Sequence, residues 1–391
     1  MIARKIADNM SKGSMIRQMF EEGNRLKALY GADNVYDFSL GNPDLPPPSA
    51  VSQALRSLVA ENQPGLHSYM SNAGHEATRQ AVAAWQSSLS GLAIPAGLVC
   101  MTVGAAGALN ASLKALLDPG DEVLVLAPFF FEYLAYIDNH GGVPVIVPAS
   151  RETLLPDPAA LEKALTPRTK AIIINSPNNP SGVIYPEETL RMLNSLLLAQ
   201  PQTIYVLSDE PYADLVYDGQ SMPATLAYLQ NAVICTSWSK SLSLPGERIG
   251  CLVVSPRCES ADQLINACVY CNRILGYVNA PALFQRVIER SINARVDIAQ
   301  YEKRRDLLAD VLTGAGFTLQ KPAGGLYLFP VCPDADDVAF ARICAGHRVL
   351  LVPGSGFRFP GYFRLCFAVR EAAILGSAHA FQDIARHYGL H

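Results

Sequence analysis

Short apolar runs alternate with longer helical patterns between about residues 95 and 255 of this 391-residue chain. The runs are rich in Val, Ile and Leu, and several of the intervening segments repeat apolar residues at helical spacing, which is typical of parallel strands joined by crossover helices. We therefore predict an α/β fold whose large domain has a mostly parallel sheet flanked by helices. The expected strands span residues 98–103, 122–127, 143–147, 171–175, 204–208, 233–237 and 250–254, and the expected helices span 108–117, 131–139 and 187–198.

The pattern changes after Pro281. Helical periodicity resumes there, and the end of the chain becomes mixed, with expected strands at 325–329, 350–352 and 362–367. This change predicts a large domain over residues 46–281 and a smaller α+β domain over 282–391. The first 45 residues are expected to form an arm that packs on the small domain, and Pro46-Pro47-Pro48 ends this arm with a stiff turn.

Composition narrows the class of protein. There are 31 basic and 35 acidic residues, a net charge of −4 without long runs of one sign, so nothing favours nucleic acid or an anionic membrane as a partner. Uncharged stretches fall short of the roughly 20 residues that span a bilayer, and the N-terminus has no apolar signal core.

The nine cysteines are odd in number and scattered, which indicates reduced thiols and a cytoplasmic location. Cys268 and Cys271 have metal-site spacing but no second pair, so we predict buried thiols on a helix and no metal site.

Candidate ligand-binding residues follow the predicted strands, because open parallel sheets bind ligands beyond the carboxyl ends of their strands. Gly104-Ala105-Ala106-Gly107 comes after the first strand and opens a helix, where free backbone N–H groups can bind a phosphate. The third glycine of a dinucleotide fingerprint is missing, and a plain turn is the alternative. Phe130, in a run of three phenylalanines, could stack on a planar cofactor or simply belong to the core.

Two further strand ends carry polar side chains. Asn179 lies in a proline-bounded loop that presents its amide, although this composition is also ordinary for a turn. Asp209 ends an apolar strand, and a buried acid requires a cationic partner, such as a protonated pyridine nitrogen. Tyr212 follows three residues later.

Lys240 lies in the most informative segment of the sequence. It follows the strand end at Ser237, and Arg248 comes eight positions after it. A hydroxyl, an amine and a guanidinium this close together can hold a phosphate beside a reactive lysine. The combination indicates pyridoxal phosphate bound as a Schiff base.

With these motifs in this order, the chain resembles the class I aminotransferases of the fold type I pyridoxal-phosphate enzymes over almost its full length. It is most similar to their aspartate-aminotransferase-like branch. The resemblance implies that Lys240 carries the cofactor and moves a proton between it and the substrate α-carbon. It also implies that Asp209 pairs with the pyridine nitrogen, and that Asn179 and Tyr212 hydrogen-bond the phenolic oxygen. The remaining implied cofactor contacts are stacking by Phe130 and phosphate binding by Ala105, Ala106, Ser237 and Arg248.

The resemblance further implies how substrate and partner bind. Arg364 matches the arginine that grips the substrate α-carboxylate, and Gly41, with the adjoining Asn42 and Pro43, matches a loop beside the substrate, which Asn179 also touches. Tyr69 matches a tyrosine that reaches the phosphate from the partner subunit, which implies a homodimer with shared active sites. No motif assigns the second cationic side chain that would bind the distal carboxylate of a substrate such as aspartate. The candidates are Arg17, Lys114 and Arg273, for which surface or interdomain charges are the alternative.

The implied reaction is amino-group exchange between an L-amino acid, aspartate or a similar donor, and a 2-oxo acid by a ping-pong mechanism. A carbon–sulfur β-lyase on the same fold is the alternative enzyme. A non-catalytic, pyridoxal-phosphate-binding regulatory domain is the alternative from another class, but no basic helix-turn-helix precedes the fold and the lysine, acid and arginine are all present.

Overall fold

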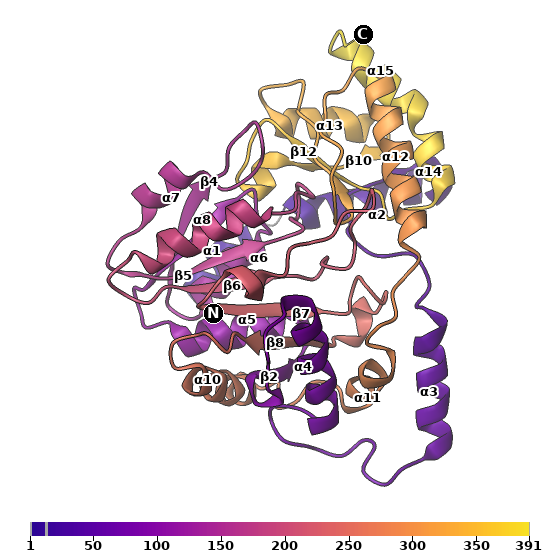
Figure 1. Ribbon diagram of the computed structural model, residues 1–391. Helices are drawn as coiled ribbons and strands as arrows, with labels where there is room; N and C mark the ends of the chain where they lie inside the picture. Colours follow the sequence, from indigo (N-terminus) through magenta and orange to yellow (C-terminus); the bar gives the residue numbers. More distant parts are fainter. Residues whose placement is uncertain (1, 12–14, 391) are drawn as a thin grey trace.

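The computed structural model describes residues 2–11 and 15–390, without the side chains of residues 8–11, 15–18 and 20. Its centre is a seven-stranded sheet with helices on both faces (Figure 1). The strand order is β2-β8-β7-β6-β5-β3-β4. The strands are β2 (Val99–Thr102), β3 (Glu122–Ala127), β4 (Val143–Pro148), β5 (Thr169–Asn175), β6 (Tyr205–Asp209), β7 (Ala232–Ser237) and β8 (Gly250–Val254).

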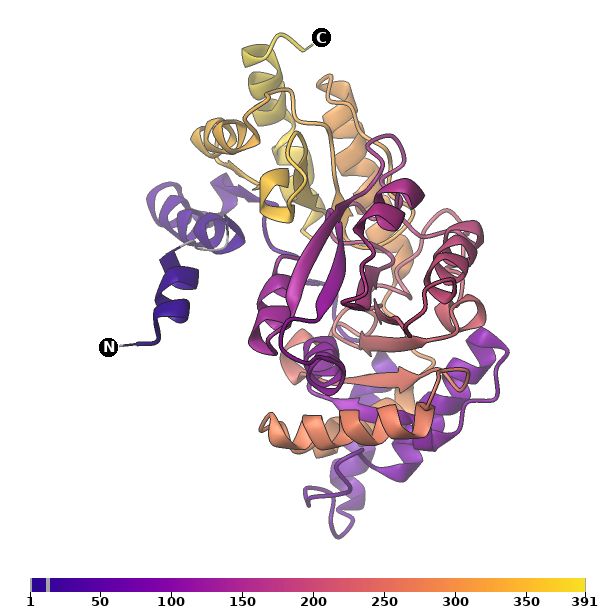
Figure 2. The ribbon, with the colours of Figure 1, turned by 90° about the vertical axis from the view of Figure 1, so that its left-hand side faces the viewer.

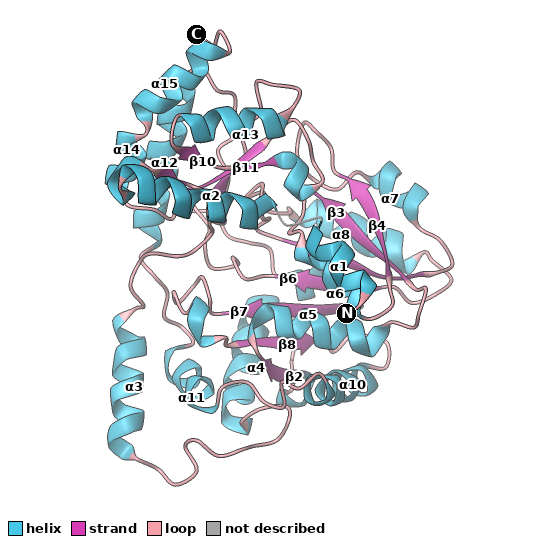
Figure 3. Cartoon of the chain, turned by 180° about the vertical axis from the view of Figure 1, so that it is seen from behind, coloured by secondary structure: helices cyan, strands magenta, loops and turns pink. Residues whose placement is uncertain are grey.

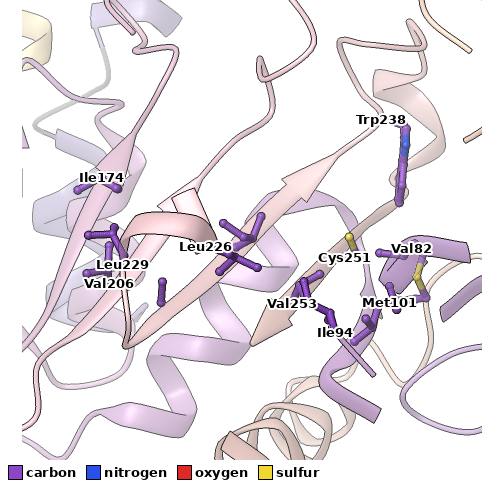
Figure 4. Packing of buried hydrophobic residues seen from close by; sticks show 14 of the residues in the cluster. Val82, Ile94, Met101, Ile174, Val206, Leu226, Leu229, Trp238, Cys251 and Val253 are labelled. Carbon is purple, nitrogen blue, oxygen red and sulfur yellow. The ribbon is translucent and has the colours of Figure 1, made fainter. Parts of the chain in front are cut away.

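Successive side chains along these strands point to opposite faces of the sheet, and each face has its own hydrophobic core. Ile172 and Ile174 of β5 pack into one core, whereas Ile173 packs into the other, as the two-residue period of a strand requires. Figure 4 shows part of the first core, where Ile174, Val206 and Val253 lie with Trp238. That core is covered by α3 (Ser49–Glu61), α4 (Glu76–Ser90), α8 (Glu187–Leu198) and α11 (Ala282–Ser291), and the second by α5 (Gly104–Leu116), α6 (Glu132–Asn139) and α10 (Ala261–Ile274).

The predicted mostly parallel sheet is confirmed, and all seven predicted strands lie within two residues of the observed ones. The helix expected from residue 108 begins at Gly104 instead, because the small residues before it carry no apolar period. Strand β8 is the exception to the parallel arrangement, since it runs antiparallel to both β7 and β2. The link from β7 to β8 has no crossover helix long enough to return the chain in parallel. This link contains Lys240 and Arg248.

The C-terminal part forms a smaller layer beside the sheet. Its antiparallel strands are β11 (Val352–Pro353), β12 (Phe363–Cys366) and β9 (Tyr327–Leu328), and its core is rich in aromatic rings such as Phe317, Phe340 and Phe381. The helices of this part are α12 (Ile298–Gly314), α13 (Asp337–Gly346), α14 (Glu371–Gly376) and α15 (Ala378–His387), coloured cyan in Figure 3. The short α7 (Pro158–Ala164) and α9 (Thr225–Tyr228) belong to the larger part.

The N-terminal segment joins this C-terminal part. Strand β1 (Tyr36–Asp37) pairs in parallel with β10 (Val349–Leu350), and Leu26 of α2 (Met15–Tyr30) packs on Leu350. In Figure 2, α2 and the preceding α1 (Arg4–Ser11) extend to one side of the molecule. Leu26 and β1 of this segment therefore contact the C-terminal part.

Helix α11 bears on where the large domain ends. Val287 and Ile288 pack into the core under the sheet, whereas Tyr301 and Leu308 of α12 pack into the C-terminal core. We propose that the boundary lies between α11 and α12, beyond the predicted residue 281. Among the helices described here, none has the length and apolarity required to cross a bilayer.

Candidate active site

A cavity of about 290 Å³ lies where the carboxyl ends of the central strands meet the C-terminal part. Eleven of the predicted site residues line it. They are Gly41, Ala105, Ala106, Phe130, Asn179, Asp209, Tyr212, Ser237, Lys240, Arg248 and Arg364. The fold thus brings together segments that are more than 300 residues apart in the sequence, such as those of Gly41 and Arg364.

Lys240 reaches the cavity from the link between β7 and β8. Its Nζ donates a hydrogen bond to the carbonyl oxygen of Gly41 at 2.6 Å. Burial lowers the pKa of this lysine to about 8, and the nearby Arg364 and Arg248 guanidinium groups act in the same direction. Because a nucleophilic amine must be unprotonated, this environment suits Lys240 to covalent chemistry near neutral pH.

Asp209 ends β6 on the wall of the cavity. One of its carboxylate oxygens accepts a hydrogen bond from the Tyr133 hydroxyl, while its Oδ1 is buried without a partner among the described residues. Burial raises the pKa of Asp209 to about 7. A buried oxygen that lacks a donor fits an N–H group such as that of a protonated pyridine. The sequence does not distinguish Tyr133 as a site residue, because Tyr133 follows a run of aromatic residues that is typical of a buried core.

This environment predicts a pH dependence of stability for the cofactor-free protein. The folded-state pKa of Asp209 is raised above its unfolded value, so its contribution to stability is present below about pH 4 and is lost as the pH rises through about 7. We expect the free energy of unfolding to fall by about 2 kcal/mol more between pH 5 and 7 in the wild type than in Asp209→Asn. Urea unfolding of both proteins at several pH values measures this difference, and equal slopes would contradict it.

The first turn of α5 and Arg248 form the cationic, donor-rich end of the cavity. Ala105 and Ala106 follow Gly104, whose φ of +70° favours glycine. A Cβ atom on Gly104 would lie 2.8 Å from Nη2 of Arg248, so a side chain there would displace the guanidinium. Ser237 also lines this end. Backbone N–H groups at a helix N-terminus, a hydroxyl and a guanidinium together suit a phosphate.

Arg364 of β12 lies at the other end of the cavity and is only 2% exposed. Its Nη1 donates to Oδ1 of Asn179 at 3.0 Å, and its Nη2 donates to the carbonyl oxygen of Ser39 at 2.6 Å. Its Nε is buried without a partner, and no acidic side chain in the described part of the chain forms an ion pair with it. A buried guanidinium with no counter-ion fits a ligand carboxylate.

Tyr327 is a further cavity residue that the sequence did not reveal. Its hydroxyl lies 3.0 Å from that of Tyr212, and its ring lies under Arg364, with Cζ of the arginine 4.4 Å from the ring centroid. A Cβ atom on Gly41 would overlap the Tyr327 hydroxyl, so this contact requires glycine. In the sequence Tyr327 looks like any apolar strand residue, because only the folded chain brings it opposite Gly41.

The remaining predicted residues lie elsewhere. Tyr69 is 88% exposed and outside the cavity. Lys114 and Arg273 are exposed and do not line the cavity either, so neither serves as a second cation within this chain. The side chain of Arg17 lies outside the described residues. The pair Cys268 and Cys271 is buried on α10 as predicted, with both thiols free.

A profile of aminotransferases of class I and II matches residues 33–378 of this chain. The chain belongs to this family. It is 36% identical to a probable aspartate/prephenate aminotransferase of Thermus aquaticus over 340 residues, 85% of this chain and 86% of that one. It is 32% identical to the aspartate aminotransferase of Thermotoga maritima over 389 residues, 98% and 99% of the two chains.

Solved structures agree with this assignment. An aminotransferase from Eubacterium rectale superposes with a TM-score of 0.96 at 38% identity, covering 99% of each chain. The aspartate aminotransferase of Thermus thermophilus, solved with maleate, superposes with a TM-score of 0.87 at 28% identity, covering 98% of this chain and 99% of that one. This protein is therefore an aminotransferase with the family's α/β fold.

Proposed function

We propose that this aminotransferase binds pyridoxal phosphate through Lys240 and exchanges an amino group between an L-amino acid and a 2-oxo acid. The observation that carries this proposal is a cavity that an amine with a lowered pKa, a buried acid and a buried guanidinium share. Within the described structure, one oxygen of the acid has no hydrogen-bond partner and the guanidinium has no counter-ion. These three groups match the amine, pyridine and carboxylate chemistry of transamination.

Each cavity residue would contact a different part of the cofactor or the substrate. When bound, pyridoxal phosphate would supply the electron sink that stabilises the carbanion formed as the substrate α-carbon loses its proton. Lys240, the one amine among the described residues that line the cavity, would hold and return that proton. Asp209 would keep the pyridine nitrogen protonated, and Asn179 and Tyr212 would hydrogen-bond the phenolic oxygen. Phe130 would stack on the ring, and Ala105, Ala106, Ser237 and Arg248 would bind the phosphate.

At the substrate end, Arg364 would bind the α-carboxylate. Asn179 and the Ser39 carbonyl orient its guanidinium, so little conformational freedom would be lost on binding. Gly41 and Tyr327 close this side of the cavity. Their packing would exclude water from the reacting atoms.

The test is a half-reaction with the purified holoenzyme. Mixed with an amino acid and no 2-oxo acid, an aminotransferase converts its cofactor once to the amine form, with a stoichiometric change of absorbance, and then stops. A carbon–sulfur β-lyase would instead turn over and release pyruvate from a cysteine-like substrate. Sustained pyruvate release, or no spectral change with any amino acid, would refute the proposed exchange.

We also propose that the active unit is a homodimer in which Tyr69 reaches the partner's cavity. The support is its position, since a ring that is 88% exposed on one chain is available to a second copy. Most closed oligomers of soluble enzymes are two-fold dimers. The nine free, buried cysteines also suit the cytoplasmic location expected from the sequence.

Subunit mixing tests this shared site. Tyr69→Phe and Lys240→Ala homodimers are each expected to be strongly impaired. After subunit exchange in an equal mixture, about half of the dimers are hybrids, and each hybrid has one intact site of two. The mixture should therefore recover about a quarter of wild-type activity. The steady-state rate before and after exchange measures the recovery. If exchange is shown by mass spectrometry and no activity returns, Tyr69 does not act across the interface.

A further inference from the structure

The positive charges of the cavity are all engaged by the proposed chemistry. Among the described residues, the cationic side chains that line the cavity are Lys240, Arg248 and Arg364. Under the proposed function they take the cofactor, its phosphate and the substrate α-carboxylate. A second substrate carboxylate, as in aspartate or glutamate, meets no further cation in the part of the cavity that the structure describes.

Glu132 adds a negative charge beside the same cavity. It begins α6 four positions before Tyr136, and residues four apart lie on the same face of a helix. Tyr136 lines the cavity, as do Phe130 and Tyr133 on either side of Glu132. The Oε2 atom of Glu132 is buried and has no hydrogen-bond partner in the described structure. An acidic group with one buried, unpartnered oxygen therefore neighbours, in sequence, the aromatic residues that line the cavity.

Glu132 interacts electrostatically with Arg364, the proposed carboxylate-binding residue of the cavity. Burial raises the pKa of Glu132, while its own backbone amide and the Arg364 guanidinium lower it. Glu132 also raises the pKa of Tyr136, second only to burial. It thus lies within electrostatic reach of both groups, yet it forms no ion pair with Arg364 among the described contacts, which leaves the guanidinium available for a substrate. Charges that are partly buried in a protein interact more strongly than charges in bulk water.

We propose that Glu132 makes this aminotransferase select against substrates with a second carboxylate, so that its amino donors are L-amino acids with uncharged or positively charged side chains. This inference rests on the proposed function and replaces the expectation that aspartate is the donor. Glu132 acts as a specificity residue through repulsion of a distal carboxylate. The α-carboxylate tolerates it because Arg364 lies in direct reach of that group.

Half-reactions of the holoenzyme with alanine, methionine, lysine, aspartate and glutamate at about pH 8 test this selectivity. Burial raises the pKa of Glu132, so the assay is run well above the ordinary glutamate pKa of about 4.3 to favour the ionised form. In the wild type, we expect kcat/KM for aspartate and glutamate to be about tenfold or more below that for methionine. Glu132→Gln keeps the shape of the side chain and removes its charge. It should raise kcat/KM for both acidic donors about tenfold and leave that for methionine within about twofold.

A control variant and the pattern of rates across the donors distinguish the possible outcomes. Glu162→Gln removes an exposed charge on α7 and should change no donor, which controls for net charge. If acidic donors lead in the wild type, or if Glu132→Gln lowers all donors alike, the inference is wrong and Glu132 has a structural role. If Arg17→Ala abolishes a preference for acidic donors, Arg17 is the selector instead. Failure of every donor would refute the proposed aminotransferase reaction itself.

Discussion

Replacing Lys240 with alanine is expected to abolish transamination, with a loss in kcat/KM of roughly 10³-fold or more. No other amine lines the cavity in the described chain, so no neighbouring side chain can take over covalent binding or proton transfer. Borohydride reduction of the wild-type holoenzyme, followed by peptide mapping, should place the pyridoxyl label on the peptide that contains Lys240. The variant should remain folded, because the substitution removes a single described side-chain hydrogen bond, from Lys240 to the carbonyl oxygen of Gly41.

Lys114→Ala and Lys170→Ala are matched controls for the labelling experiment. Both lysines lie outside the cavity, so these variants should retain the label on Lys240 and near wild-type activity. A label on Lys114 or Lys170, or none on any peptide, would remove the basis of the assigned site.

Arg364→Lys is expected to lower kcat/KM by about 10- to 100-fold for every amino acid, because losing one side of a charge-assisted, bidentate contact costs on the order of 1.5–3 kcal/mol. Lysine keeps the charge but cannot form two parallel hydrogen bonds to a carboxylate. Arg364→Ala should lose more, since it also leaves Oδ1 of Asn179 without its donor. The cofactor absorbance should persist in both variants.

The comparison across donors decides the role of Arg364. Arg342→Lys, at an exposed position on α13, serves as a control and should leave all rates unchanged. If Arg364→Lys impaired only aspartate and glutamate, then Arg364 would be the side-chain selector. The α-carboxylate would then require another partner.

Much of the fold could be predicted from local patterns alone. Runs such as Ile172-Ile173-Ile174 are buried on both faces of the sheet, so each strand appears as a continuous apolar segment with clear ends. Polar residues at those ends, among them Asp209 and Lys240, could be placed on one edge because parallel strands end together. The direction of β8 could not be predicted from its own residues, since an apolar run is the same in either direction.

The sequence by itself determined the sheet, the order of its strand-end motifs and the lysine, acid and arginine of the cavity, because each belongs to a local pattern or a family motif. Tertiary structure alone decided the contacts between distant segments. Tyr133 of α6 contacts Asp209 of β6, and Tyr327 of β9 packs against Gly41 of the N-terminal segment, only when these distant segments fold together. The burial of Arg364 without an ion-pair partner among the described residues, and the burial of Oε2 of Glu132, also depend on packing, because both are properties of the surroundings rather than of the residue.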